Sequence, residues 1–301
     1  MDSYVSCRLC PRECGTDRTK SKGFCKESAS VRLGRAALHM WEEPCISGTK
    51  GSGAIFFTGC NMQCVFCQNR EISRGLIGKV VTVERLIEIF FELKDQGANN
   101  INLVTADIHI PAIAAAIEKA RSMNIGIPFL LNTSSYIKAE SIKRLDGLID
   151  IYLPDFKYIR DEDSIKYSNA PDYVNTAKAA IDEMIRQRPY CEFRDDTDGQ
   201  KLLINGVIVR HLLIPGMLIQ AKLILNYLFK RYGDRIYISL LNQYTPNKEL
   251  NDHPEINRKI THNEYKSLID YALNIGIVNG FIQEGNTADE SFIPLFDLRG
   301  V

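Results

Sequence analysis

The stretch GCNMQCVFCQN, residues 59–69, places Cys60, Cys64 and Cys67 in the spacing C-x3-C-x2-C, directly after the apolar, β-prone run AIFF (54–57). Structural zinc sites usually pair C-x2–4-C with a second pair of ligands further along the chain. A ferredoxin-type cluster uses C-x2-C-x2-C and a fourth cysteine. The observed spacing matches neither well. It is typical of a loop in which three thiolates hold a 4Fe–4S cluster and one iron stays open for a substrate.

The overall composition excludes several classes of partner. The 301 residues contain 37 Lys+Arg and 37 Asp+Glu, so the formal net charge is zero, which does not indicate binding to nucleic acid or to an acidic membrane surface. We see no uninterrupted apolar run long enough to cross a bilayer. The first residues, MDSYVSCRLC, lack the pattern of a signal peptide. We therefore expect a cytoplasmic protein without nucleic-acid or membrane partners.

Strand and helix patterns alternate along the chain. Apolar strand patterns occupy 54–57, 101–106, 127–133, 148–154, 207–215, 235–241 and 278–283. Helical patterns occupy 83–93, 110–123, 139–145 and 172–188, and lie around 217–231 and 262–275. The polar stretch 194–200 predicts a surface loop or hairpin tip. Six or seven βα units predict an α/β fold with a parallel sheet, a partial or closed TIM-like barrel, since no G-x-G-x-x-G follows an early strand.

The cysteines are concentrated at the start of the chain. Of nine, eight lie in the first 67 residues, and thiols bunched at one end of a cytosolic chain indicate metal ligands. A second set follows the spacing C-x2-C-x3-C-x10-C, namely Cys7, Cys10, Cys14 and Cys25. It suits a structural zinc or an auxiliary iron–sulfur cluster, with no metal as the alternative. We expect a cysteine-rich leader over residues 1–50 and a barrel over 51–301, with Cys45 and Cys191 as small buried hydrophobes.

The loop of three cysteines after a first strand resembles that of the radical S-adenosylmethionine (SAM) superfamily. Other stretches resemble proteins related to the pyruvate formate-lyase activating enzyme. They are CRLCPREC (7–14), HMWEEPCISGTKGSGAIFFTGCNMQCVFCQN (39–69), YLPDFKY (152–158), KYSNAPDY (166–173), VRHLLIPG (209–216) and NQYTP (242–246). The resemblance covers nearly the whole chain. Its cysteine motif is specific for the chemistry and says little about the substrate.

This resemblance implies an enzyme with a 4Fe–4S cluster and SAM. SAM would bind the open iron, one electron would break its sulfonium C–S bond, and the resulting 5′-deoxyadenosyl radical would take a hydrogen atom from the substrate. The resemblance also implies an electron donor such as flavodoxin or ferredoxin, and a glycyl-radical enzyme as the partner whose glycine is activated. A small molecule or another protein is the alternative substrate. A non-catalytic electron carrier or structural metal protein is the alternative of a different class.

Polar residues at strand ends are the candidates for SAM binding, because functional groups of βα barrels gather at the carboxyl ends of strands. Asn132 and Thr133 end the third predicted strand, and Asp155 and Lys157 end the fourth. The resemblance places Asp155 and Lys157 beside the SAM carboxylate. A plain salt bridge between them is the alternative.

Further candidates follow two other strands. Radical SAM enzymes often hold the SAM amino group with a Gly-Gly-Glu stretch, which this chain lacks; Thr105 or Asp107 is expected to replace it, and a helix cap by Asp107 is the alternative. Strand alternation sends either Arg210 or His211 inward, and we expect Arg210 near SAM or substrate and His211 in the core. Two more residues line the substrate side or pack at the barrel rim, Gln243 and Tyr244.

Overall fold

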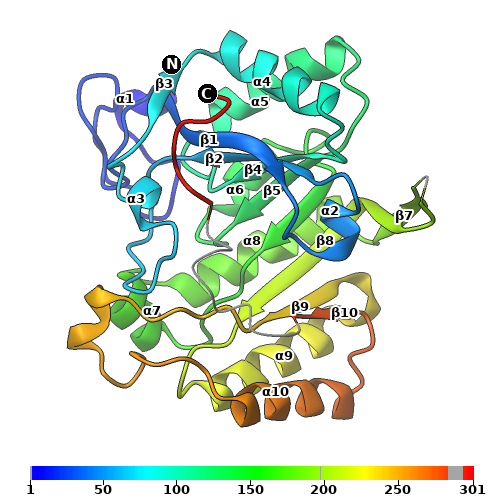
Figure 1. The fold of residues 1–301 in the computed structure, drawn as a ribbon. Helices are drawn as coiled ribbons and strands as arrows, with labels where there is room; N and C mark the ends of the chain where they lie inside the picture. Colours follow the sequence, from blue (N-terminus) through cyan, green and yellow to red (C-terminus); the bar gives the residue numbers. More distant parts are fainter. Residues whose placement is uncertain (1, 197, 284–293) are drawn as a thin grey trace.

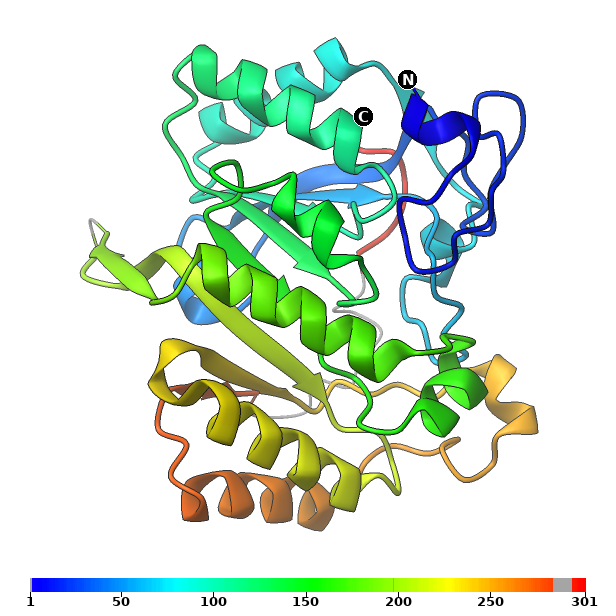
Figure 2. The same cartoon turned by 180° about the vertical axis from the view of Figure 1, so that it is seen from behind.

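The computed structural model describes residues 2–196, 198–283 and 294–301, which form one open α/β sheet with most helices on one face (Figures 1 and 2). The strand order is β10-β9-β8-β6-β5-β4-β2-β1-β3. Seven neighbouring strands run parallel: β2 (Ser52–Phe57), β4 (Ile101–Val104), β5 (Phe129–Thr133), β6 (Ile151–Pro154), β8 (Lys201–Leu212), β9 (Tyr237–Leu241) and β10 (Gly280–Ile282). Within these residues the sheet does not close, so the partial form of the predicted barrel is confirmed.

Two antiparallel strands at one edge were not predicted. β1 (Val31–His39) pairs with β2, and β3 (Lys79–Val81) pairs with β1. Charged residues interrupt the apolar pattern of β1, but Arg32 pairs with Glu27 and Arg35 pairs with Asp297, both at 2.8 Å. β1 lies within the stretch 1–50 expected as a leader. The division into leader and barrel stays a prediction, and part of the expected leader belongs to the sheet.

The helices that cover the sheet agree with the sequence patterns. They are α4 (Val83–Asp95), α5 (Ile110–Ser122), α6 (Ala139–Lys143), α8 (Tyr173–Gln187), α9 (Leu218–Tyr232) and α10 (His262–Asn274). Thr82 caps α4 by accepting a hydrogen bond from the backbone N–H of Arg85, and Thr261 and Glu264 form a capping box at α10. In the described part of the chain, no helix has the length and apolarity needed to cross a membrane.

The short elements were not predicted, because they span too few residues for a helical period to appear. They are α1 (Asp2–Val5), α2 (Pro44–Ser47), α3 (Arg70–Ser73), α7 (Asp161–Ser168) and the 3-10 helices Gly233–Arg235 and Lys248–Asp252. The expected hairpin is present: β7 (Glu192–Asp195) pairs antiparallel with β8, although Thr197 at its tip lies outside the described residues.

The short helix α2 fills part of the concave face of the sheet. Cys45 and Ile46 of α2 pack against apolar residues of β5, β6 and β8, and Cys191 lies beside the same apolar cluster. Both cysteines are therefore small hydrophobic groups in packing contacts, as predicted. The remainder of the concave face, towards the carboxyl ends of the strands, holds the candidate site.

Candidate active site

A cavity of about 660 Å³ lies on the concave face of the sheet. Cys60, Cys64 and Cys67 line it together with polar residues from the ends of four strands: Thr105, Asn132, Thr133, Asp155, Lys157 and Arg210. The volume lies in the range of small-molecule sites, about 300–1,000 Å³. The structure thus brings six of the seven predicted SAM-binding residues to one cavity with the three loop cysteines. Asp107 is not among the residues that line it.

The cysteine loop is held by backbone hydrogen bonds on two sides. The N–H groups of Gln63 and Val65 donate to the carbonyls of Ser168 and Tyr167 at 3.0 and 2.9 Å. On the other side, the N–H of Cys60 donates to the carbonyl of Cys25 at 3.2 Å. Gly59 has φ +77°, and a Cβ there would lie 2.6 Å from that Cys25 carbonyl oxygen. Glycine is required at this position because the leader packs directly against the loop.

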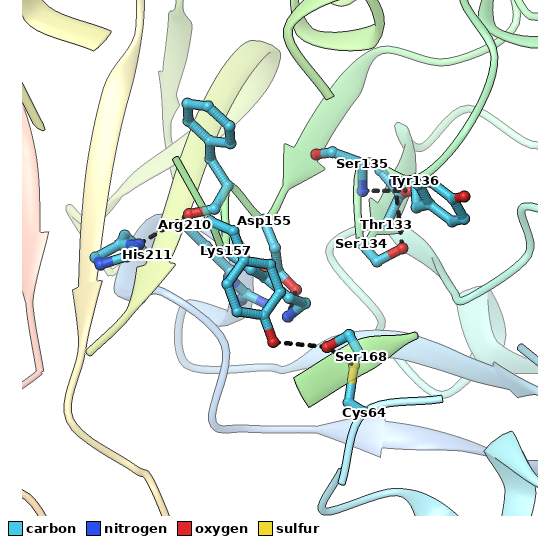
Figure 3. Close-up of polar contacts among 12 residues, drawn as sticks. Cys64, Thr133, Ser134, Ser135, Tyr136, Asp155, Lys157, Ser168, Arg210 and His211 are labelled. Carbon is cyan, nitrogen blue, oxygen red and sulfur yellow. Dashed lines mark hydrogen bonds and ion pairs between the residues drawn. The ribbon is translucent and has the colours of Figure 1, made fainter. Parts of the chain in front are cut away.

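The environment of the three thiols suits ligands of a cluster. The Ser168 hydroxyl donates to Cys64 Sγ at 3.0 Å, and Ser168 Oγ lies 2.6 Å from the Tyr158 hydroxyl (Figure 3). Burial raises the pKa of Cys64 to about 11 and that of Cys60 well above its usual value, so a metal must displace their protons. No fourth cysteine appears among the described residues that line the cavity. Three thiolates with an open side fit a cluster that keeps one iron free.

Asp155 and Lys157 form an ion pair on the cavity wall (Figure 3), with 2.5 Å between Asp155 Oδ2 and Lys157 Nζ. Burial alone would lower the pKa of Lys157, but the opposing effects, of which the charge of Asp155 is the largest, outweigh burial, and the pKa is raised. The lysine therefore stays cationic next to the cysteine loop. The salt bridge is present as the alternative expected, and a contact of this pair with SAM stays a prediction.

Arg210 faces the cavity, as predicted, and Glu42 and Glu43 hold its guanidinium. Its Nε and Nη2 donate to the two carboxylate oxygens of Glu43 at 2.8 and 2.5 Å, and Nη2 also donates to Glu42. Asn102 donates to the other oxygen of Glu42 at 2.8 Å. The sequence patterns did not predict roles for Glu42 and Glu43. The pair of acids directly before Pro44 was the one signal that could have indicated them.

His211 points to the opposite face of β8 from Arg210. Its Nδ1 lies 2.8 Å from the Phe156 carbonyl oxygen, and the ring is buried (Figure 3). Burial lowers the pKa of His211 to about 4, so the ring is neutral. The predicted role as a core histidine is confirmed.

The segment after β4 carries two candidates for SAM binding, Thr105 and Asp107, and only Thr105 lines the cavity. Thr105 lines the cavity in a left-handed conformation, with φ +59°. Asp107 is 1% exposed, and among the described residues neither of its carboxylate oxygens accepts a hydrogen bond. The N-cap position of α5 is His109, so the cap by Asp107 is wrong. Burial raises the pKa of Asp107 to about 7, and the side chain of Thr133 and the backbone of Ser134 act in the opposite direction.

Gln243 and Tyr244 both line the cavity and also pack at its rim. The Gln243 carbonyl accepts a hydrogen bond from Gln68 Nε2 at 2.5 Å. The Tyr244 hydroxyl donates to the Ile256 carbonyl at 2.9 Å, and its ring centroid lies 5.7 Å from that of Phe66. Rim packing is confirmed, and a contact with substrate stays a prediction.

The leader cysteines lie outside the cavity. Cys7, Cys10 and Cys25 are buried, whereas Cys14 is exposed. In the described residues, no three side chains of Cys, His, Asp or Glu converge closely enough to hold a single metal ion, and this applies to the loop cysteines as well. A metal on the leader stays a prediction.

Comparison with known proteins finds a similarity to one superfamily of enzymes. Residues 54–194 match the model of the radical SAM superfamily. An uncharacterized protein of Methanocaldococcus jannaschii is 27% identical over 277 residues, which cover 89% of this chain and 75% of that protein. The structure of the FeFe-hydrogenase maturase HydG from Carboxydothermus hydrogenoformans superposes with a TM-score of 0.51 at 16% identity, over 80% of this chain and 56% of HydG. SuiB from Streptococcus suis gives a TM-score of 0.49 at 12% identity, over 76% of this chain and 49% of SuiB.

The chain thus spans about half the length of these two solved structures, and the likeness to HydG shows a common fold. The matched residues include the three loop cysteines and the strands from β2 to β6. Through residues 54–194, the chain is similar to the radical SAM superfamily.

Proposed function

We propose that this chain cleaves SAM reductively and uses the resulting 5′-deoxyadenosyl radical to remove a hydrogen atom from a substrate. The observation that carries the proposal is that Cys60, Cys64 and Cys67, without a fourth cysteine in the described lining, face the same cavity as a row of strand-end polar groups. A 4Fe–4S cluster on these cysteines supplies the electron for cleavage of the C–S bond when it is bound.

The residues of the cavity supply positioning and electrostatics. Lys157 offers a cation for the carboxylate of SAM, and Asp155 keeps that cation in place. Asn132 and Thr133 line the adjacent wall with groups suited to the amino and hydroxyl groups of SAM. Asp107 does not line the cavity, so it would act on the SAM amino group only through the wall that contains Thr133, and only when its carboxyl group, with a pKa of about 7, is ionised.

The test is cleavage of SAM by anaerobically reconstituted protein. With SAM and dithionite, we expect 5′-deoxyadenosine and methionine in equal amounts, slowly even without substrate. The matched control is the Cys60→Ala/Cys64→Ala/Cys67→Ala variant, which should form neither. A wild-type protein with an intact, reduced cluster that never cleaves SAM would overturn the proposal in favour of an electron carrier or a structural metal protein.

For the substrate, we propose the glycine of a glycyl-radical enzyme, on the resemblance to activating enzymes. Incubation with pyruvate formate-lyase, SAM and reductant should then give the electron paramagnetic resonance (EPR) signal of a glycyl radical. Reduced flavodoxin or ferredoxin should replace dithionite as the electron donor. SAM cleavage without a glycyl radical would instead direct the search to a small molecule or another protein. Zinc or a second iron–sulfur cluster on the leader cysteines is a separate proposal, outside this chemistry.

A further inference from the structure

The start of the leader winds through a compact set of loops at one side of the sheet (Figures 1 and 2), and its Cys25 carbonyl accepts a hydrogen bond from the Cys60 N–H of the cysteine loop. Backbone hydrogen bonds from Cys7 to Thr16 at 3.0 Å and from Gly15 to Cys7 at 3.1 Å close the segment CRLCPREC on itself. A side chain at Gly23 would begin 3.4 Å from Cys25 Sγ and 3.6 Å from Cys14 Sγ. The thiols of Cys14 and Cys25 therefore both pack against Gly23, which has no side chain to keep them apart.

A buried cation next to these thiols has no negative partner. Arg18 is 1% exposed and donates to the carbonyls of Ile108 and Ser28 at 2.8 and 2.7 Å. Its Nη1 also lies 3.8 Å from Cys7 Sγ. Within the described ranges, no carboxylate lies within ion-pair distance of Arg18. The Glu27 carbonyl and the Tyr4 ring also contact this guanidinium. These groups solvate the charge but do not neutralise it, so an anion bound here would be stabilised.

A second guanidinium lies on the other side of the leader, towards the cysteine loop. Arg12 stacks over the Phe24 ring at 4.0 Å, and its Nε donates to the Asn61 carbonyl at 2.8 Å. It too forms no ion pair with any carboxylate of the described residues. Arg12 is only partly buried, and its Nη2 also donates to the Asn169 carbonyl. Water and carbonyls therefore solvate its charge, and negative charge on the leader thiols would add a favourable interaction.

We propose that Cys7, Cys10, Cys14 and Cys25 bind a metal centre as four thiolates, and that its negative charge is balanced by Arg12 and Arg18. Four thiolates around Zn²⁺ and four thiolates around an oxidised 4Fe–4S core carry the same net charge, two negative units, which equals the charge of the two guanidiniums. The balance of charge therefore predicts four thiolate ligands but does not distinguish zinc from a 4Fe–4S cluster. Metal analysis identifies which of the two is bound. In the described residues no three of these thiols converge on one point, so the ligands draw together when the metal binds, and the exposed Cys14 is one of those that must move.

The proposed centre also supports the loop of the active site. The Cys25 carbonyl accepts the N–H of Cys60, and Arg12 holds the carbonyl of Asn61. A metal that fixes Cys25 therefore fixes the first ligand of the loop. This second consequence rests on the proposed function, whereas metal binding by the leader does not.

Metal analysis of the full chain tests the site. In the Cys60→Ala/Cys64→Ala/Cys67→Ala variant, we expect either about one zinc per chain or iron with matching sulfide, held by the leader alone. Adding Cys7→Ser and Cys10→Ser to this variant should remove the metal. The control variant, which carries Cys45→Ser and Cys191→Ser in their place, should keep it. Zinc and iron both support the site and identify its metal. Neither metal above background, or metal unaffected by the leader substitutions, overturns it.

The charge argument has its own test. Arg18→Met should make the leader metal several-fold easier to remove with a chelator, whereas Lys20→Met, a change at an exposed lysine of the same segment, should not. If the loop variants are insoluble, the same comparison holds in the wild-type background. There, Cys7→Ser/Cys10→Ser should lower the total metal content by the amount that the leader binds. SAM cleavage measures the loop cluster separately in the same protein. Equal metal retention by Arg18→Met and Lys20→Met would overturn the proposed balance of charge.

Discussion

The two groups of cysteines differ in what surrounds them. The loop group, Cys60, Cys64 and Cys67, lines a cavity that also contains Lys157, a cation already paired with Asp155. The leader group lies between two guanidiniums that have no carboxylate partner in the described part of the chain. The loop group opens onto a cavity, as the ligands of a catalytic metal site do. Three of the four leader cysteines are buried and the fourth, Cys14, is exposed.

The comparison predicts that only the loop group is required for the chemistry. Replacing any one of Cys60, Cys64 or Cys67 by Ala should remove most of the cluster iron and abolish SAM cleavage, because the cluster loses a covalent ligand. Iron, sulfide and the visible absorption spectrum measure the effect. Cys45→Ala is the matched control, since Cys45 packs in an apolar cluster. Unchanged iron content in the Cys60 variant would contradict the assignment.

The buried carboxyl group of Asp107 should make the metal-free protein sensitive to pH. Its pKa of about 7 in the folded chain compares with about 3.9 when unfolded. Between these values the folded chain holds a proton that the unfolded chain has lost, so stability falls as pH rises from about 4 to 7, by at most about 4 kcal/mol. The melting temperature of the wild type should drop over this range more than that of Asp107→Asn. Parallel curves for the two proteins would show that the carboxyl group does not titrate in this way.

Lys157 tests whether the open side of the loop group receives SAM. A charge-assisted contact with the SAM carboxylate is worth about 1.5–3 kcal/mol, so Lys157→Met should weaken SAM binding roughly ten- to a hundredfold. Cluster iron should not change. Binding can be measured by equilibrium dialysis with the cluster oxidised. The control is Lys178→Met on α8, where the ammonium lies 4.6 Å over the Tyr227 ring. Wild-type affinity in the Lys157 variant would refute the placement of SAM.

The smallest predicted effect concerns the reduction potential of the loop cluster. The hydrogen bond from Ser168 to Cys64 Sγ stabilises the more negative, reduced state, so Ser168→Ala should lower the potential. A bond worth about 1.4 kcal/mol corresponds to about 59 mV for one electron. Tyr158→Phe should act in the same direction but less, because Tyr158 acts through Ser168. EPR-monitored titration measures the shift, and equal potentials in all three proteins would exclude the effect.

Several features were predictable because they depend on residues close together in the sequence. The period of α4 places Leu86, Ile89, Phe90 and Leu93 on one buried face, as observed. The alternation of strands and helices led to the parallel sheet, and the spacing of the three loop cysteines led to the site. In each case, the local pattern is tied to the structure by the geometry of one helix, one strand or one loop.

Other features were decided only by the tertiary structure. β1 was missed because its arginines look unsuited to a half-buried strand until Glu27 and Asp297 are brought to them. Glu42 and Glu43 were missed because their partner, Arg210, lies on a strand far along the chain. A buried charge is tolerated only next to its counter-charge. Which charges meet depends on the order of strands in the sheet, and no local period or spacing contains that information.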